Sequence, residues 1–254
     1  MTCGHSNRED PLFDRIAPSY VKKDLTLYCR IARKLRLLRT LKNVPKPVGA
    51  LLEIGCGAGF SAEYLRGQYR RMVGIDYSAN LIAFATKYNA SPQASFYCQD
   101  VKDFSTEQTF DVILMIGVLH HLKDAEYVLT RLRSFLAEGG VLLANEPQKG
   151  NPLIVLMRRI RKRIDPEYAM DQIEFSEREF QDVFARCGYT VRLLPQGFLS
   201  TPLAETRLLP GFIGVPLAWL VSVVDPILEV LLSGRILRKL AWNIVVEARA
   251  AGKE

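Results

Sequence analysis

Short apolar runs alternate with longer segments of helical pattern from residue 50 onward. Helices are expected over 61–66, 79–88 and 125–137, the last ended by Gly139 and Gly140. The apolar runs are short enough for strands and are ALLEI (50–54), RMVGI (71–75), SFYC (95–98), FDVILMI (110–116) and GVLLAN (140–145). This alternation predicts an α/β fold with a mostly parallel sheet and helices on both faces.

Two further strands, YTVRLL (189–194) and NIVVEA (243–248), complete a predicted seven-stranded Rossmann-like sheet. About 48 residues separate them, too many for a hairpin loop, so the pattern predicts an insertion before the last strand.

The insertion contains an apolar stretch over 208–224 that is expected to stop at Asp225 and Pro226. Prolines and glycines interrupt the stretch at Pro210, Gly211, Gly214 and Pro216. A membrane-spanning helix needs about 20 apolar residues, and this stretch is shorter and interrupted. We interpret it as a lid over an apolar pocket or as a segment at a membrane surface, and the pattern does not decide between the two.

The N-terminal part carries a basic stretch over 22–46 with an apolar stripe. Apolar residues recur there at steps of three and four, at Val21, Leu25, Tyr28, Ile31, Leu35 and Leu38. The spacing predicts one amphipathic helix. In one interpretation, the apolar face of this helix packs on the core and its cationic face is solvated. In the other, the helix contacts a membrane surface or an acidic partner.

The composition fits one large globular domain: 254 residues, 48% hydrophobic and 24% charged. A net charge of +7 permits an anionic partner. The charge gathers in the 22–46 stretch and in a second cluster over 158–163. The five cysteines lack the paired spacing of a zinc site, so no metal is expected. No apolar signal core is visible over 1–13, and the expectation is a reduced, cytoplasmic setting.

The strand ending near Glu53 runs directly into a glycine-rich turn, LLEIGCGAGF at 51–60. Gly55, Gly57 and Gly59 let the backbone bend sharply and approach a ligand closely. A glycine-rich turn alone is weak evidence for any one cofactor, because enzymes that bind dinucleotides also have such a turn. In their GxGxxG pattern a third glycine stands at the position that Phe60 occupies here.

Three carboxylates narrow the choice of cofactor. Asp76 ends the second strand, where its oxygens can accept hydrogen bonds from ribose hydroxyls of NAD or of S-adenosylmethionine alike. Glu53 stands just before the glycines and Asp100 just after the third strand. A pyrophosphate at the turn would be repelled by a neighbouring carboxylate, whereas a sulfonium and an amino group would tolerate or favour one. The charges therefore favour S-adenosylmethionine.

The ordered motifs resemble those of class I S-adenosylmethionine-dependent methyltransferases, in the broad group that includes the quinone-biosynthesis C-methyltransferases. LLEIGCGAG, VGIDYS, QDV, FDVILMIGVLHHL and LAEGGVLLANEP resemble the group's first to fifth motifs, and the likeness covers about residues 10–195. FDRIAPSY (13–20) resembles the segment that caps the cofactor in related enzymes. The implied domains are a basic cap helix region over 1–46 and a methyltransferase domain over 47–254, with 150–170 and 200–240 as lid or membrane-facing insertions.

The resemblance implies a set of cofactor-binding residues. Gly55, Gly57 and Gly59 would surround the methionine part and the ribose, with Cys56 in the same turn and Asp76 on the ribose hydroxyls. Glu53 would order the turn or reach the amino group through water. The remaining members are Tyr77 beside the adenine, Asp100 and Val101 on its polar edge, Ile116 and Gly117 near the transferring methyl, and Tyr20 in the capping segment.

Methyl transfer is an in-line displacement that needs mainly alignment and exclusion of water, so a dedicated base is optional. His120 and His121 follow the fourth strand and are candidates for a general base. The alternative is that one caps the following helix or bonds the loop backbone while the other faces solvent. Glu146 ends the fifth strand and is a candidate base or acceptor-orienting group, against a structural hydrogen-bonding role.

Basic residues beside apolar segments after Glu146 suggest an anionic bilayer surface. The expected acceptor is small and hydrophobic, such as a quinone, an isoprenoid or another lipid-like molecule, taken up by a cytoplasmic enzyme that contacts the inner face of the membrane. Nucleic acid is not expected, because aromatic residues are not interleaved with the basic runs. The alternatives are a nucleic-acid methyltransferase, a nicotinamide oxidoreductase, or a non-catalytic module that binds S-adenosylmethionine or docks on a membrane.

Overall fold

The computed structural model describes residues 12–152, 154–156, 175–205, 209–232 and 237–252. At its centre lies one seven-stranded sheet with the strand order β3-β2-β1-β4-β5-β7-β6. The strands are β1 (Val48–Ile54), β2 (Tyr69–Asp76), β3 (Ala94–Cys98), β4 (Phe110–Ile116), β5 (Leu136–Pro147), β6 (Tyr189–Gln196) and β7 (Asn243–Ala250). Neighbouring strands are parallel except β7, which runs antiparallel to β5 and β6. The predicted mostly parallel, seven-stranded sheet is confirmed.

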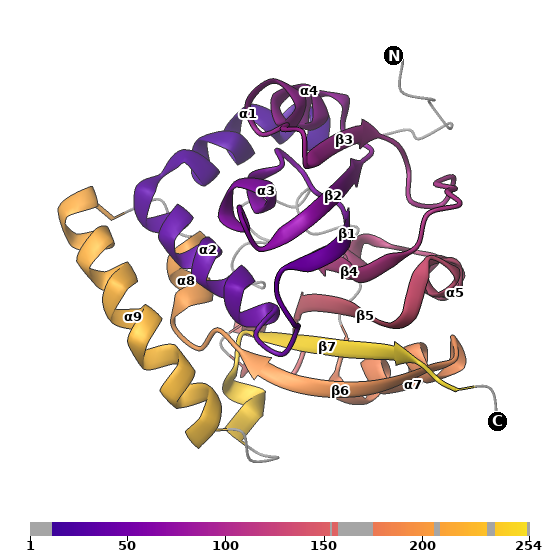
Figure 1. Cartoon of the computed structure of the whole chain (residues 1–254). Helices are drawn as coiled ribbons and strands as arrows, with labels where there is room; N and C mark the ends of the chain where they lie inside the picture. Colours follow the sequence, from indigo (N-terminus) through magenta and orange to yellow (C-terminus); the bar gives the residue numbers. More distant parts are fainter. Residues whose placement is uncertain (1–11, 153, 157–174, 206–208, 233–236, 253–254) are drawn as a thin grey trace.

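Helices cover both faces of the sheet (Figure 1). One face packs against α1 (Leu12–Leu25), α2 (Leu27–Thr40), α3 (Phe60–Tyr64) and α4 (Ala79–Tyr88), in a core that includes Leu37, Leu65 and Leu81. The other face packs against α5 (Ala125–Ser134) and α7 (Glu177–Arg186), whose buried side chains include Val128 and Phe180. Shorter elements are η1 (Leu119–His121), α8 (Ser200–Glu205) and η3 (Leu237–Leu240).

The basic N-terminal stretch forms two helices, so the prediction of one amphipathic helix was wrong. Thr26 separates α1 from α2 with an extended backbone, φ −69° and ψ 121°. Its hydroxyl donates to the carbonyl of Lys22 and so satisfies one exposed carbonyl at the end of α1. The break separates α1 from α2, and Tyr28 and Cys29 of α2 are buried in a small separate core with residues of the insertion.

The helix predicted over 125–137 ends earlier, at Ser134, and β5 already begins at Leu136. Gly139 and Gly140 lie inside that strand and are not a helix stop. The reason is pairing with β4: the amide of Phe110 donates to the carbonyl of Phe135, and Phe110 pairs with Leu136 before an irregularity shifts the register. Tertiary pairing outweighs the local helical pattern here.

The insertion before β7 is present and forms one 21-residue helix, α9 (Gly211–Leu231). The helix contains Pro216 and Pro226, so the expected stop at Asp225 and Pro226 was wrong. Packing of its inner face against α2 and α8 outweighs the local cost of the prolines. Among the described residues, α9 is the one helix long and apolar enough to cross a membrane, which is weak evidence alone. The basic cluster at 158–163 lies outside the described residues.

Candidate active site

The glycine-rich turn lies at the carboxyl end of β1, between β2 and β4, where the strand order reverses. Open α/β sheets bind ligands in the crevice at such a switch point. Gly55, Gly57 and Gly59 all have positive φ, of 67°, 53° and 74°, a conformation that L-residues with a side chain rarely adopt. The amides of Gly55 and Cys56 donate to the carbonyl of Ile75 and hold the turn against β2.

Asp76 at the end of β2 is tied directly to this turn. Its Oδ2 accepts from the amide of Gly57 at 2.9 Å, and its Oδ1 accepts from the amide of Ser78 at 2.9 Å. Burial raises the pKa of Asp76, while the two amide donors lower it. Each carboxylate oxygen has a second lone pair, so the group can still accept hydrogen bonds from a ligand such as a ribose.

Glu53 is buried at the end of β1, beneath the turn. Its Oε1 accepts from the Ser61 hydroxyl at 2.6 Å, whereas its Oε2 is buried without a hydrogen-bond partner among the described residues. Burial raises the pKa of Glu53 to about 8, with a further contribution from the charge of Asp76. A buried acceptor that lacks a donor fits a site built to receive a cationic or hydrogen-bonding group.

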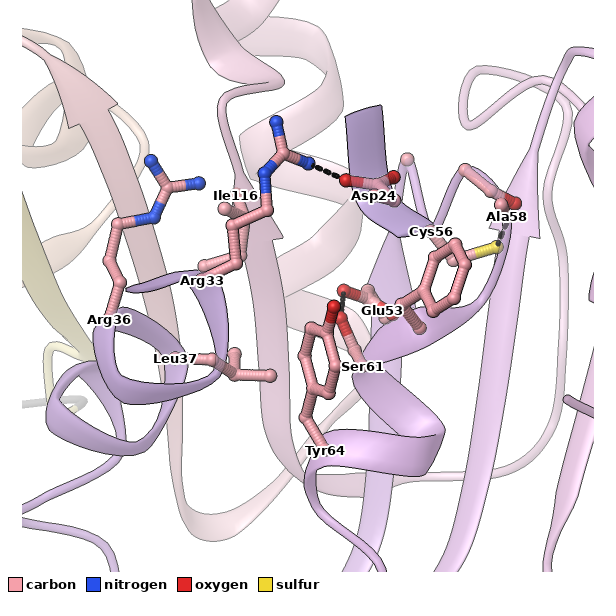
Figure 2. A pocket seen from close by; sticks show the side chains of 13 residues that line it. Asp24, Arg33, Arg36, Leu37, Glu53, Cys56, Ala58, Ser61, Tyr64 and Ile116 are labelled. Atoms are coloured by element: carbon pink, nitrogen blue, oxygen red, sulfur yellow. Dashed lines mark hydrogen bonds and ion pairs between the residues drawn. The ribbon is translucent and has the colours of Figure 1, made fainter. Parts of the chain in front are cut away.

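A cavity opens beside Glu53, between the glycine turn and α2 (Figure 2). Five residues predicted from the sequence line it: Glu53, Gly55, Cys56, Gly57 and Ile116. Burial raises the pKa of the Cys56 thiol, so that side chain is neutral near pH 7. The carboxyl end of β1, the glycine turn and the carboxyl end of β4 therefore meet at this cavity, as the order of the motifs predicts.

The opposite wall of this cavity was not predicted. It consists of Asp24 from α1, Arg33, Arg36 and Leu37 from α2, and Tyr64 from α3. Arg33 forms an ion pair with Asp24, and Figure 2 shows both arginines extending from the same helix, with Arg33 directed toward Asp24. In the sequence these arginines are two among many cations of the 22–46 stretch, and no spacing distinguished them.

The residues expected around the adenine lie at the ends of β2 and β3. Tyr77 is exposed directly after Asp76, and Val101 is buried in the core. Asp100 accepts from the amide of Lys102 at 3.0 Å through Oδ1. Tyr20 belongs to α1, but its side chain lies outside the described residues. Tyr77, Asp100 and Val101 do not line the described cavity, and the cofactor contacts of all four residues stay predictions.

Gly117 follows β4 at the edge of the site, with φ 65°. Its amide donates to the carbonyl of Asn145 at 2.9 Å, which fixes the loop after β4 against β5. This loop leads directly into η1, which carries both histidines.

The structure brings His120 and Glu146 together. His120 Nδ1 lies 2.7 Å from Oε2 of Glu146, and Oε1 of Glu146 accepts from the amides of Val118 and Leu119 at 2.8 Å each. Glu146 is fully buried and both its oxygens are engaged. These contacts make Glu146 a positioning group for η1 and for the His120 ring, which corresponds to the hydrogen-bonding alternative.

His121 packs its ring against His120, with ring centroids 4.1 Å apart. Burial lowers the pKa of His121 to about 3, helped by the neighbouring His120, so the ring is neutral at physiological pH. Neither histidine nor Glu146 lines the described cavity. A catalytic role for any of the three stays a prediction.

The residues present fit S-adenosylmethionine. The unpartnered Oε2 of Glu53 suits the cationic groups of the methionine end, and a Cβ added to Gly57 would meet nothing within 4 Å. The open space at Gly57 is room for a ligand against the backbone. Arg33 and Arg36 bring positive charge to the same cavity, which suits a carboxylate.

Comparison with known proteins supports the same class. Residues 52–144 match the methyltransferase domain family. The chain is 32% identical over 95 residues to a malonyl-(acyl-carrier protein) O-methyltransferase of Bacillus anthracis, covering 37% of this chain and 35% of that protein. It is 33% identical over 118 residues to a ubiquinone biosynthesis O-methyltransferase of Nitrobacter winogradskyi, covering 46% and 42%. The chain thus spans less than half the length of these curated relatives.

Solved structures share the fold over nearly the whole chain. A methyltransferase solved with the Haloferax volcanii Trm112 methyltransferase activator superposes with a TM-score of 0.66 at 16% identity, covering 97% of this chain and 100% of that one. The DhpI-SAM-HEP complex superposes with a TM-score of 0.59 at 17% identity, covering 93% and 94%. At such identities the likeness shows the fold.

The family match over residues 52–144, the glycine turn and the shared fold support a class I S-adenosylmethionine-dependent methyltransferase. Within this class, residues 52–144 carry the methyltransferase domain of the matched family. The predicted class and its cofactor, S-adenosylmethionine, are confirmed at this level.

Proposed function

We propose that this protein transfers the methyl group of S-adenosylmethionine to a small hydrophobic acceptor of the quinone, isoprenoid or lipid-like kind. The observation that carries the proposal is the buried Oε2 of Glu53, which lacks a partner and borders the cavity next to the glycine turn. An uncompensated buried acceptor is costly unless a ligand satisfies it.

The bound cofactor would supply a methyl group already activated by its sulfonium. Gly57 and Asp76 would hold the ribose, because the turn leaves open space and the carboxylate retains lone pairs. Glu53 would balance the positive charge of the methionine end, and Arg33 and Arg36 would hold its carboxylate. Closure of α2 over the turn would exclude water from the reacting atoms.

Proton removal from the acceptor needs no dedicated group if the nucleophile is already ionised or loses its proton to water. Where a base takes part, His120 is the better candidate, because its Nδ1 bonds Glu146 and leaves Nε2 to accept a proton. Glu146 would fix the tautomer and the ring orientation.

Two observations support a hydrophobic acceptor. The relatives include proteins named ubiquinone biosynthesis O-methyltransferase, and ubiquinone is a quinone. In addition, α9 exposes large apolar side chains beside α2, the helix that forms one wall of the cavity. We therefore place the enzyme, as a proposal, in the cytoplasm at the inner face of the membrane.

The test is transfer of a labelled methyl group from S-adenosylmethionine into cell extract, followed by separation of lipid, small-molecule, protein and nucleic-acid fractions. Label is expected in the lipid fraction. Asp76→Asn should give less label because it binds the cofactor more weakly, and Asp103→Asn, which changes an exposed carboxylate outside the site, is the active control. Label in nucleic acid would exclude the proposed acceptor class, and cofactor binding without any transfer would favour a non-catalytic module.

A further inference from the structure

Helix α9 has its polar and apolar faces reversed relative to a helix on the surface of a soluble protein. Its two charged residues, Asp225 and Glu229, are buried. The exposed large side chains are all apolar: Phe212, Ile213, Trp219, Leu220, Val223, Ile227, Val230 and Leu231. Their exposed fractions run from 46% at Ile213 to 80% at Phe212. A contiguous apolar face of this kind marks a contact surface.

The inner face of α9 is fixed to the domain by a buried polar cluster. Arg39 of α2 lies 3.3 Å from Oδ2 of Asp225 and 3.1 Å from Oε1 of Glu229. Asp225 also accepts from the amides of Leu199 and Ser200, and Glu229 accepts from the amide of Gly197. These bonds hold one face of α9 toward the protein and direct the opposite face outward.

The N-terminal half of α9 is held by close packing. Gly214 faces the ring of Tyr28 on α2, and a Cβ at Gly214 would lie 2.4 Å from that ring. Ala218 and Val221 continue the same buried stripe. Both halves of α9 therefore lie on α2, and Figure 1 shows α9 as an outer layer with α2 between it and the sheet.

This attachment argues against a membrane-spanning arrangement. To cross a bilayer, α9 would have to leave α2, and Asp225 and Glu229 would enter hydrocarbon without Arg39. Carboxylates inside a bilayer are costly unless they are paired. A helix that lies in the plane of the interface keeps the cluster intact and still covers the apolar face.

Charge favours an anionic bilayer as the occupant of this face. The chain carries a net charge of +7, and α2 and the turn after it present exposed cations at Lys34 and Lys42. Lys42 is close enough to Glu229 to act on its ionisation, so this cation lies near the C-terminal half of α9. Trp219, with more than half of its surface exposed, is of the residue type that prefers the membrane interface.

We propose that the outer face of α9 inserts in-plane into the surface of an anionic bilayer, with Asp225, Glu229 and Arg39 kept on the protein side. The biological role of this contact rests on the proposed function, because the contact would bring the α2 wall of the cavity close to a membrane that holds the hydrophobic acceptor. The contact itself does not require methyl transfer.

The test is flotation of the full chain with vesicles of phosphatidylcholine and phosphatidylglycerol, compared with vesicles of phosphatidylcholine alone. We expect the protein to float with the anionic vesicles at low salt and much less with the neutral ones. The double variant Val223→Glu/Ile227→Glu should lose at least tenfold in vesicle affinity. Tyr97→Glu, which adds a carboxylate at an exposed aromatic residue on β3, away from α9, is the control and should float like the wild type.

Several outcomes would overturn the inference. One is no flotation of the wild type with anionic vesicles at low salt, and another is unchanged flotation of the double variant. Resistance of the bound protein to extraction at high pH would indicate a spanning helix. A dimer in sedimentation that the double variant makes monomeric, without vesicle binding, would assign the face to a second copy of the chain.

Cofactor calorimetry separates this inference from the proposed function. The double variant should bind S-adenosylmethionine like the wild type, because neither residue lines the cavity. Loss of flotation with retained cofactor binding supports the docking face. Flotation by a wild type that transfers no methyl group would leave the docking face supported and overturn the proposed activity alone.

Discussion

The amide nitrogen of Gly57 lies 2.9 Å from Oδ2 of Asp76, so the turn after β1 and the carboxylate at the end of β2 form one unit. The same carboxylate accepts from the amide of Ser78 through its other oxygen. A change at either residue should therefore alter the turn and the ribose-binding group together.

Asp76→Asn should weaken cofactor binding. An asparagine can accept through one oxygen only, so one of the two amides, of Gly57 or of Ser78, would face an NH₂ group. We expect a loss of about 1–3 kcal/mol in folding free energy and at least about a tenfold loss of affinity for S-adenosylmethionine, measured by calorimetry. Asp103→Asn is the control on an exposed side chain. Equal affinity of Asp76→Asn and wild type would remove Asp76 from the site.

Glu53 should make cofactor binding depend on pH. Burial holds the pKa of Glu53 at about 8, so the free protein carries a proton there at neutral pH. A cationic ligand favours the ionised form and must expel that proton. Affinity for S-adenosylmethionine should therefore rise with pH up to about 8, by as much as about tenfold per pH unit. Glu53→Gln removes this dependence, and subtracting its profile removes the titration of the cofactor's own amino group.

The same group should affect stability in the opposite direction. Because the pKa of Glu53 is raised from 4.5 to about 8 on folding, the folded protein holds an extra proton between these values. The free energy of unfolding of the ligand-free protein should then fall as pH rises through this window. Denaturant titrations should show a smaller decline for Glu53→Gln, and an equal decline would indicate that other groups cause it.

Gly57→Ala and Gly59→Ala should separate binding from folding. Both glycines have positive φ, which costs an alanine about 1 kcal/mol. A Cβ at Gly57 meets nothing and points into the space offered to the cofactor, so affinity should fall while stability changes little further.

A Cβ at Gly59 would lie 2.8 Å from the Phe96 ring and 2.9 Å from Cβ of Ala85. Overpacking of this kind costs about 1–3 kcal/mol in addition. The melting temperature of Gly59→Ala should therefore be lower than that of Gly57→Ala. The reverse order would contradict the close packing at Gly59.

Glu146→Gln should reveal whether Glu146 positions His120. The glutamine oxygen can still accept from the amides of Val118 and Leu119, but its NH₂ group would face Nδ1 of His120 and select the other tautomer. We expect the cofactor affinity to stay nearly unchanged. The kcat should fall, but by less than the roughly hundredfold loss that removal of a general base causes. His120→Ala should lower kcat by at least as much. Full activity of both variants would remove the base hypothesis.

Much of the fold followed from the sequence because the signals are local. The central strands β1 and β4 contain continuous apolar runs, as expected for strands buried on both faces, and α4 (Ala79–Tyr88) was predicted with its observed bounds. The glycine turn was recognisable for the same reason, because positive φ at every second residue from 55 to 59 favours glycine at those positions.

Local pattern misled where tertiary contacts outweigh it. Leu136 lies in the predicted end of a helix, yet it pairs with Phe110 of β4 and begins β5. Prolines in α9 read as breaks, yet packing and the Arg39 cluster keep the helix continuous. Propensity differences of about 1 kcal/mol per residue are smaller than such long-range terms.

By itself the sequence determined the class of protein, the cofactor turn and the acidic residues Glu53 and Asp76, because these lie in short motifs at strand ends. Only the tertiary structure decided which cations reach the cavity, that Glu146 holds His120, and that α9 turns its charges inward. Arg33 is nine residues from its partner Asp24, but Arg39 is 186 residues from Asp225. Pairings over such separations depend on how the whole chain packs, and no local spacing encodes them.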